Sequence, residues 1–166
     1  MTPNFLVLLG SAFIPMVVGM LWYNPKTFLN PWMKGAGLTE DEMKANQKPL
    51  KFLLGFICNF LLAFGLFTAV THEFSILGLV GGDQELLKTG TAAAFLAEYG
   101  GSYARFSHGI VHGIVAAVAF ALPLIGHQCL WSGKGWKYFF IDFGFWLVCM
   151  ILMCGVIAQW GGTMVV

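Results

Sequence analysis

Charged residues are scarce in this 166-residue chain. Nine Lys and Arg and eight Asp and Glu make up 10% of the sequence, whereas 58% of the residues are hydrophobic. A soluble domain carries about 25% charged residues, so this composition excludes a soluble globular domain and a disordered chain. The net charge of +1 supplies no basic field to attract phosphate, which excludes a nucleic-acid binder. An integral membrane protein remains.

Motifs that carry well-known chemistry are also missing. The sequence contains no HExxH motif, no phosphate loop and no nucleophile elbow, so we expect no enzymatic activity and no cofactor. The four cysteines form no CxxC pair and no zinc-ligand spacing, and we expect them to act as small packing residues. There is no internal repeat, which argues against the inverted-repeat architecture of many transporters.

Four apolar stretches are each about 20 residues long, enough to cross a hydrocarbon core about 30 Å thick as helices. None of them alternates polar with apolar residues as a barrel strand does. The sequence therefore predicts an all-α fold, an integral membrane four-helix bundle that forms a single membrane domain over residues 1–166. No Lys or Arg precedes residue 26, so the first stretch lacks the basic region of a signal peptide, and we expect it to be a retained helix. The expected spans are about 4–23, 52–71, 106–126 and 138–160.

The basic residues are unevenly distributed between the two sides of this bundle. Loops one and three together contain seven lysines, whereas the side of loop two contains only Lys88 and Arg105. Lys and Arg accumulate in cytoplasmic loops. We therefore expect loops one and three in the cytoplasm and both termini outside.

Loop one contains a helix signal. Thr39 followed by Glu42 matches the capping-box pattern and predicts a short interfacial helix at about residues 40–47. Phe28 and Trp32 lie among lysines in the same loop, which is typical of a segment at the membrane surface.

Loop two, roughly residues 72–105, is expected to be partly helical and extracytoplasmic. Asp83 can cap a short helix that begins at Gln84, and residues 92–99 favour a second helical piece. An irregular surface loop is the alternative. Loop three is expected to be a turn over residues 127–135.

Small residues recur at every fourth position of the third span. Membrane helices associate by close packing of such residues. We expect this ladder to pack within the bundle, and a homo-oligomer interface is the alternative. The partners expected are membrane lipid and either a second copy of the chain or other membrane subunits. The ladder comprises Gly109, Gly113, Ala117 and Ala121.

Polar residues at membrane depth are candidates for function. His108 and His112 lie four residues apart, hence on one helix face, and His72 and Glu73 share their level near the outer surface. Such a cluster, with Glu98 or Arg105 as further members, is compatible with a metal or haem site or with a proton-responsive site. Interface histidines bonded to backbone, water or lipid are the simpler interpretation. Because the spacing fixes no third ligand, we assign no metal.

Asp142 is the one acid inside a span, near the cytoplasmic end of the fourth. Its level matches that of Trp22, Tyr23 and Asn24 at the inner end of the first span. It is expected to accept hydrogen bonds from Tyr, Trp or Asn or to pair with a lysine, and a proton or cation step is the alternative. Asn59, near mid-membrane, is expected to form an interhelical hydrogen bond.

Several stretches resemble a known family. They run Gly19-Met20-Leu21-Trp22-Tyr23-Asn24-Pro25, His108-Gly109-Ile110-Val111-His112-Gly113 and Ile141-Asp142-Phe143-Gly144-Phe145-Trp146. In pattern and order they resemble the bacterial domain-of-unknown-function family number 1761. The resemblance implies a small four-helix protein of a bacterial inner membrane and supplies no activity. It suggests that Trp22, Tyr23, Asn24, Pro25, His108, His112 and Asp142 matter to the fold or to a site.

Three functions are compatible with these observations. The first is a structural or accessory membrane protein that acts as a homo-oligomer or within a larger complex, which the scarcity of interior polar groups favours. The second is an oligomeric channel or transporter for an ion or small solute, with Asp142, Asn59 and His112 along its path. The third, least favoured, is a haem- or metal-binding membrane protein that uses His108 and His112.

Overall fold

The computed structural model describes residues 2–163 and is almost entirely helical. Four segments are long and apolar enough to cross a membrane, which confirms the all-α fold with four candidate spans. They are α1 (Phe5–Trp22), α4 (Pro49–Val70), the run from α7 (Phe106–Ala116) through η2 (Ala117–Ala121) to α8 (Leu122–Trp131), and α9 (Trp136–Trp160). The shorter elements are β1 (Thr2–Pro3), α2 (Leu29–Ala36), α3 (Glu40–Asn46), α5 (Glu73–Leu79), η1 (Leu86–Lys88), α6 (Gly90–Tyr99) and β2 (Gly162–Thr163).

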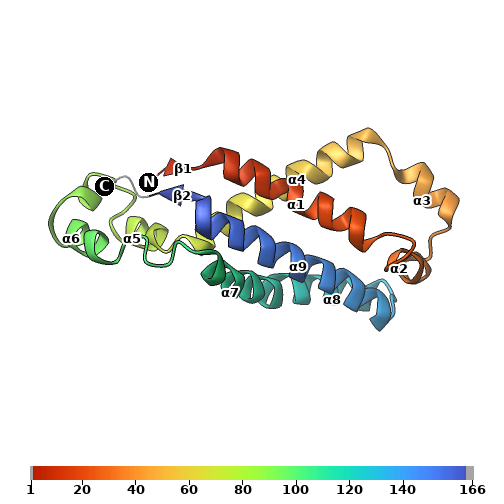
Figure 1. Cartoon of the computed structure of the whole chain (residues 1–166). Helices are drawn as coiled ribbons and strands as arrows, with labels where there is room; N and C mark the ends of the chain where they lie inside the picture. The colour runs from red at the N-terminus through yellow and green to blue at the C-terminus, as the bar shows by residue number, and fades with distance from the viewer. Residues whose placement is uncertain (1, 164–166) are drawn as a thin grey trace.

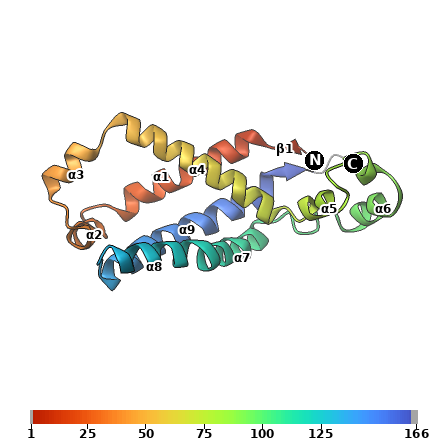
Figure 2. The same ribbon diagram turned by 180° about the vertical axis from the view of Figure 1, so that it is seen from behind.

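The long helices form an elongated bundle with short elements at its two ends (Figures 1 and 2). Helices α2 and α3 lie at one end, and α5, α6 and the antiparallel pair of two-residue strands β1 and β2 lie at the other. Helix α9 is the central helix of the bundle. In its most apolar stretch 44% of the residues are buried, whereas the corresponding share is 22–28% in the other three spans. The largest fully buried side chains include Leu8 of α1, Phe67 of α4 and Met153 of α9.

The small-residue ladder of the third span faces α9. A Cβ atom added at Gly109 would collide with the backbone of Cys154, and one at Gly113 would lie 2.5 Å from the Cα atom of Ile151. All four ladder residues are buried. The ladder therefore packs within the bundle and lets the two backbones approach closely.

The third span contains a π-helical turn, η2, that the sequence pattern did not predict. Pro123 lies just after this turn, at the second residue of α8. Proline has no N–H to offer the preceding turn of a helix, and a π-turn is one way for a helix to absorb such an interruption. The helix thereby continues instead of breaking.

The third span also ends later than expected, at Trp131 instead of about residue 126, so loop three is shorter than predicted. His127 and Gln128 continue the helix. Gly133, with φ at 68°, ends it: its N–H is directed to the carbonyl of Leu130, and the N–H of Lys134 bonds to the carbonyl of Cys129. This pair of bonds is a Schellman motif, which requires the left-handed conformation that glycine adopts readily.

Loop one contains two helices where the sequence predicted one. The predicted helix is α3, and its capping box is confirmed, with the Thr39 hydroxyl accepting from the N–H of Glu42 and the Glu42 carboxylate accepting from the N–H of Thr39. The second helix, α2, ends at Gly37 in the left-handed conformation.

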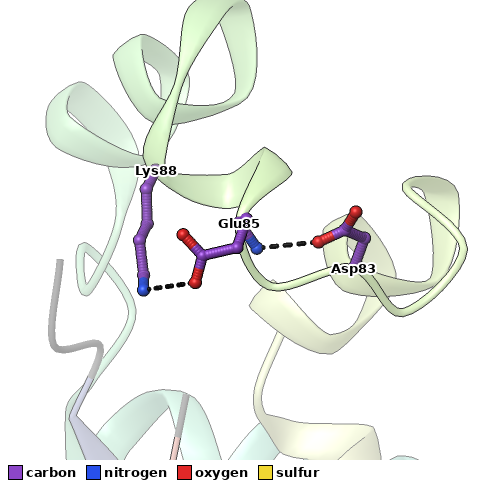
Figure 3. Close-up of polar contacts among 3 residues, drawn as sticks. All are labelled: Asp83, Glu85 and Lys88. Carbon is purple, nitrogen blue, oxygen red and sulfur yellow. Dashed lines mark hydrogen bonds and ion pairs between the residues drawn. The ribbon is translucent and has the colours of Figure 1, made fainter.

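Loop two is partly helical, as expected, and contains α5 in addition to the two predicted pieces. Asp83 does not cap an α-helix; its carboxylate accepts a 2.9 Å hydrogen bond from the N–H of Glu85, which is an Asx turn. Lys88 in turn pairs with Glu85 at 2.8 Å across the 3₁₀ turn η1 (Figure 3). Helix α6 matches the second predicted piece.

Candidate metal centre

Three histidines meet at the loop-two end of the bundle. His72 lies at the junction between α4 and α5, while His108 and His112 lie one helical turn apart near the beginning of α7. Residues four apart share a helix face, so the two α7 imidazoles point the same way. The turn at the end of α4 adds the third ring from a different helix.

The three Nε2 atoms form a compact triangle. His72 and His112 are 3.0 Å apart, His108 and His112 are 3.0 Å apart, and His72 and His108 are 3.3 Å apart, each measured between Nε2 atoms. A neutral imidazole has one nitrogen that carries a proton and one with a free lone pair. Three lone pairs this close repel each other unless a proton or a cation lies between them.

The size of the triangle matches a metal site. A zinc ion binds histidine nitrogens at about 2.0–2.1 Å, and tetrahedral angles then place those nitrogens about 3.3 Å apart. Angles near 90°, as in an octahedral face, bring them to about 2.9 Å at the same bond length. The observed separations of 3.0–3.3 Å span this range. Three histidines also leave further coordination positions open, as in catalytic zinc sites.

Aromatic and charged side chains of loop two surround the trio. The ring of Tyr103 lies 4.8 Å from that of His108 and 5.5 Å from that of His72, measured between centroids. The Arg105 guanidinium lies 5.9 Å from the centre of the Tyr103 ring. Glu73, expected in this cluster, does not join the convergent nitrogens; its carboxylate accepts a 3.1 Å hydrogen bond from the N–H of Gly101.

A cavity of about 750 Å³ adjoins the trio through His72. It lies between the ends of α4 and α9, helices α5 and α6, and the segment 100–104. Its walls carry apolar side chains such as Ile76, Leu96 and Ile157, with Tyr103 and Glu73 among the polar lining residues. His72 therefore belongs to both the trio and the cavity lining, and Tyr103 lies beside both.

Asp142 lies at the opposite end of the bundle, so the structure separates it from the histidines. One of its oxygens, Oδ1, accepts hydrogen bonds from the Tyr23 hydroxyl at 2.9 Å and from the Trp32 indole N–H at 2.7 Å. The indole N–H of Trp22 donates to the backbone carbonyl of Ile141 at 3.1 Å. These bonds tie the end of α1 and helix α2 to α9, and Asp142 is thus an acceptor for a tyrosine and a tryptophan.

The remaining candidate residues lie outside both clusters. Asn24 accepts a hydrogen bond from the N–H of Lys26, and the carbonyl of Pro25 accepts one from Asn30; both belong to the turn after α1. Asn59 is buried in α4, with 8% of its surface exposed. The sequence therefore placed Trp22 and Tyr23 correctly beside Asp142, whereas Asn24 is engaged elsewhere.

Two features of these sites were missed by sequence reasoning. Trp32 was assigned to the membrane surface, and its bond to Asp142 has no signal in the sequence beyond the aromatic richness of loop one. Tyr103 was not among the candidates, because nothing in the sequence distinguishes it from the other aromatic residues of loop two. Its position beside the histidines depends on the path of segment 100–104, which the hydrogen bond from the N–H of Gly101 to Glu73 ties to the start of α5.

Comparison with known proteins identifies the family of the chain. No curated protein and no solved structure matches the chain. The family model described as a protein of unknown function, DUF1761, matches residues 6–158, which is nearly the whole chain and includes the three histidines and Asp142. The chain therefore belongs to the DUF1761 family.

Proposed function

We propose that this protein binds a divalent transition-metal ion through His72, His108 and His112. The observation that carries the proposal is the triangle of Nε2 atoms. Its sides of 3.0–3.3 Å fit three nitrogens bound to one shared metal ion. Imidazole ligands suit Zn²⁺, Cu²⁺, Ni²⁺ and iron, and not the oxygen-seeking Ca²⁺ or Mg²⁺. This proposal replaces the expectation from sequence that the chain binds no metal.

We propose a binding role for the ion and no enzymatic step. Glu73 is the carboxylate adjacent to His72 in the chain, and its bond to the N–H of Gly101 holds it away from the trio. The basic loops one and three lie at the far end of the bundle from the histidines. The preference of Lys and Arg for the cytoplasm therefore supports an extracytoplasmic metal site in a bacterial inner membrane, with both termini on the same side.

We further propose, as expected from the sequence, that the chain acts as a structural or accessory subunit, in a homo-oligomer or with other membrane proteins and lipid. Because the ladder of α7 and η2 is buried against α9, such association would use other exposed apolar faces, such as those of α1 and α4. Their exposed apolar side chains include Phe13, Leu53 and Leu61. A channel path through Asp142 is less well supported, because its Oδ1 already accepts two hydrogen bonds.

Metal analysis of the purified protein tests the proposal. After incubation with Co²⁺ or Zn²⁺ and removal of free ion, we expect about one ion per chain, and for Co²⁺ a visible absorption band of a low-symmetry site. Separate His72→Ala, His108→Ala and His112→Ala variants should each lose the band and most of the bound ion.

His127→Ala is the matched control, because it removes a histidine of the same chain at the other end of the bundle, where its ring accepts a hydrogen bond from Trp131. It should bind metal like the unaltered protein. Equal metal content in all four variants would assign binding to other groups. No bound ion in the unaltered protein would show instead that protons shared between the rings hold the trio together.

A further inference from the structure

The lining of the cavity beside His72 is of two chemical kinds. His72 and Tyr103 supply polar groups next to the metal centre, and α5, α6 and α9 supply apolar side chains, among them Ile76, Leu96 and Ile157. A volume of about 750 Å³ is within the range of sites that enclose small organic ligands. The molecule that fits such a space carries a polar head and an apolar tail.

The positive charge at the metal centre favours an anionic head group on the ligand. Three neutral imidazoles leave the full +2 charge of a bound ion uncompensated, and Arg105 beside Tyr103 adds a further positive charge. Glu73 is the acidic side chain that lines the cavity, and it already accepts a hydrogen bond from the N–H of Gly101. An anionic group that takes an open coordination position would neutralise part of this charge.

We infer that the cavity binds an amphiphilic carboxylate, with its carboxylate on the metal held by His72, His108 and His112 and its hydrocarbon chain among the apolar residues of α5, α6 and α9. The inference rests on the proposed function, since the ion holds the head. The tail adds apolar area removed from water, so affinity rises with chain length.

Three probes separate head from tail. Octanoate has both, acetate has the head alone and octanol has the tail alone. When each is titrated into the Co²⁺-loaded protein in one detergent, octanoate should change the visible band at a concentration at least tenfold lower than acetate does. Octanol should leave the band unchanged, because it has no anionic group to coordinate the ion.

Two tryptophan substitutions on α5 locate the tail. Ile76 lines the cavity and is half-buried, so Ile76→Trp should fill it and raise the octanoate requirement to the level of acetate. Leu79 belongs to the same helix, is 86% exposed and is not among the lining residues, so Leu79→Trp should retain the preference. Acetate should act equally on both variants, which shows that each still holds the ion.

The outcomes distinguish this inference from the proposed function. Native protein that shows the Co²⁺ band but responds equally to octanoate and acetate would overturn the ligand and leave the metal site standing. A preference for octanoate that survives Ile76→Trp would overturn the assignment to this cavity. Native protein that shows no Co²⁺ band at all would overturn both, because the carboxylate head would then have no ion to bind.

Discussion

Gly113 of α7 lies directly against Ile151 of α9, so close that a Cβ atom at position 113 would be 2.5 Å from the Ile151 Cα atom. The contact is to backbone, which cannot rotate away as the end of a side chain can. The approach of the two helices therefore depends on the missing side chain.

Gly113→Ala should accordingly destabilise the protein. Overpacking of this kind costs about 1–3 kcal/mol, which we expect to lower the midpoint of thermal unfolding in detergent by several degrees. Gly55→Ala on α4 is the control, because an added Cβ there meets nothing within 4 Å and alanine favours the helix. Equal midpoints for the two variants would contradict the tight α7–α9 contact.

The protein should tolerate loss of the Asp142 charge better than loss of the hydrogen-bond acceptor at this position. In Asp142→Asn the amide oxygen can still accept from Tyr23 and Trp32, whereas Asp142→Ala leaves both donors without that acceptor. An unsatisfied buried donor costs about 1–3 kcal/mol, so the alanine variant should unfold at a clearly lower temperature than the asparagine variant. If both lose stability equally, the charge itself matters, which would revive a role in ion movement.

The capping box of α3 should respond to acid. Hydrogen bonds from the N–H and then the hydroxyl of Thr39 hold the pKa of Glu42 below its ordinary value. A group with a lowered folded-state pKa stabilises the fold above its unfolded pKa, and this contribution is lost as the pH falls through the folded pKa. Amide NMR shifts of α3 should therefore stay helical through the ordinary carboxyl range and change only at lower pH.

Glu42→Gln is the control for this titration. Glutamine can make the same reach to the N–H of Thr39 but has no charge to lose, so the transition assigned to position 42 should disappear while α3 remains at neutral pH. Glu40, which pairs with Lys44 and also has a lowered pKa, remains in both proteins. Loss of α3 in Glu42→Gln at neutral pH would show that charge, and not the capping bond, supports the helix.

Metal should stabilise the folded chain. An ion present at about 100 times its dissociation constant adds about 2.7 kcal/mol to stability when only the folded state binds it. For a chain of this length we expect Zn²⁺ to raise the unfolding midpoint by about 5–10 °C. His112→Ala should show no such rise and His127→Ala the full rise; a rise in both would indicate binding elsewhere.

The orientation can be read from two introduced cysteines, each placed in a chain whose four native cysteines are replaced by alanine, because a maleimide could also label the exposed Cys58. Thr89 lies in loop two and Ser132 in loop three, and both are exposed. In intact bacterial cells a membrane-impermeant maleimide should label Thr89→Cys, and it should label Ser132→Cys only after the membrane is opened. The opposite pattern would invert the proposed topology and place the histidines in the cytoplasm.

The sequence predicted the long helices well because their signal is simple. A run of about 20 apolar residues has few alternatives to a membrane helix, and the capping box of α3 is a local pattern that Thr39 and Glu42 specify by themselves. Helix α5 was missed because seven residues are too few to show a helical period. The end of the third span was misplaced because His127 and Gln128 look like the start of a loop, although polar side chains are tolerated where a helix leaves the hydrocarbon.

The candidate site was predictable only in part. The spacing of His108 and His112 establishes that they share a helix face. His72 was predicted to lie near them because it is at the same depth in the membrane. Whether three rings at one level meet within 3.3 Å depends on the angle and rotation of α4 relative to α7, which long-range packing determines. The contact of Gly113 with α9 helps to set that packing, and no local pattern contains it.

The π-helical turn at η2 resets the angular phase of the third span. Such a turn takes up about one extra residue, which rotates everything after Ala121 by about 100° relative to an unbroken α-helix. Helices α7 and α8 therefore pack against α9 independently of each other. The contacts of Gly109 and Gly113 orient α7 and its histidines, and other side chains orient α8. A change in the rotation of α8 can be taken up in this turn, so the positions of His108 and His112 on α7 do not depend directly on how α8 packs.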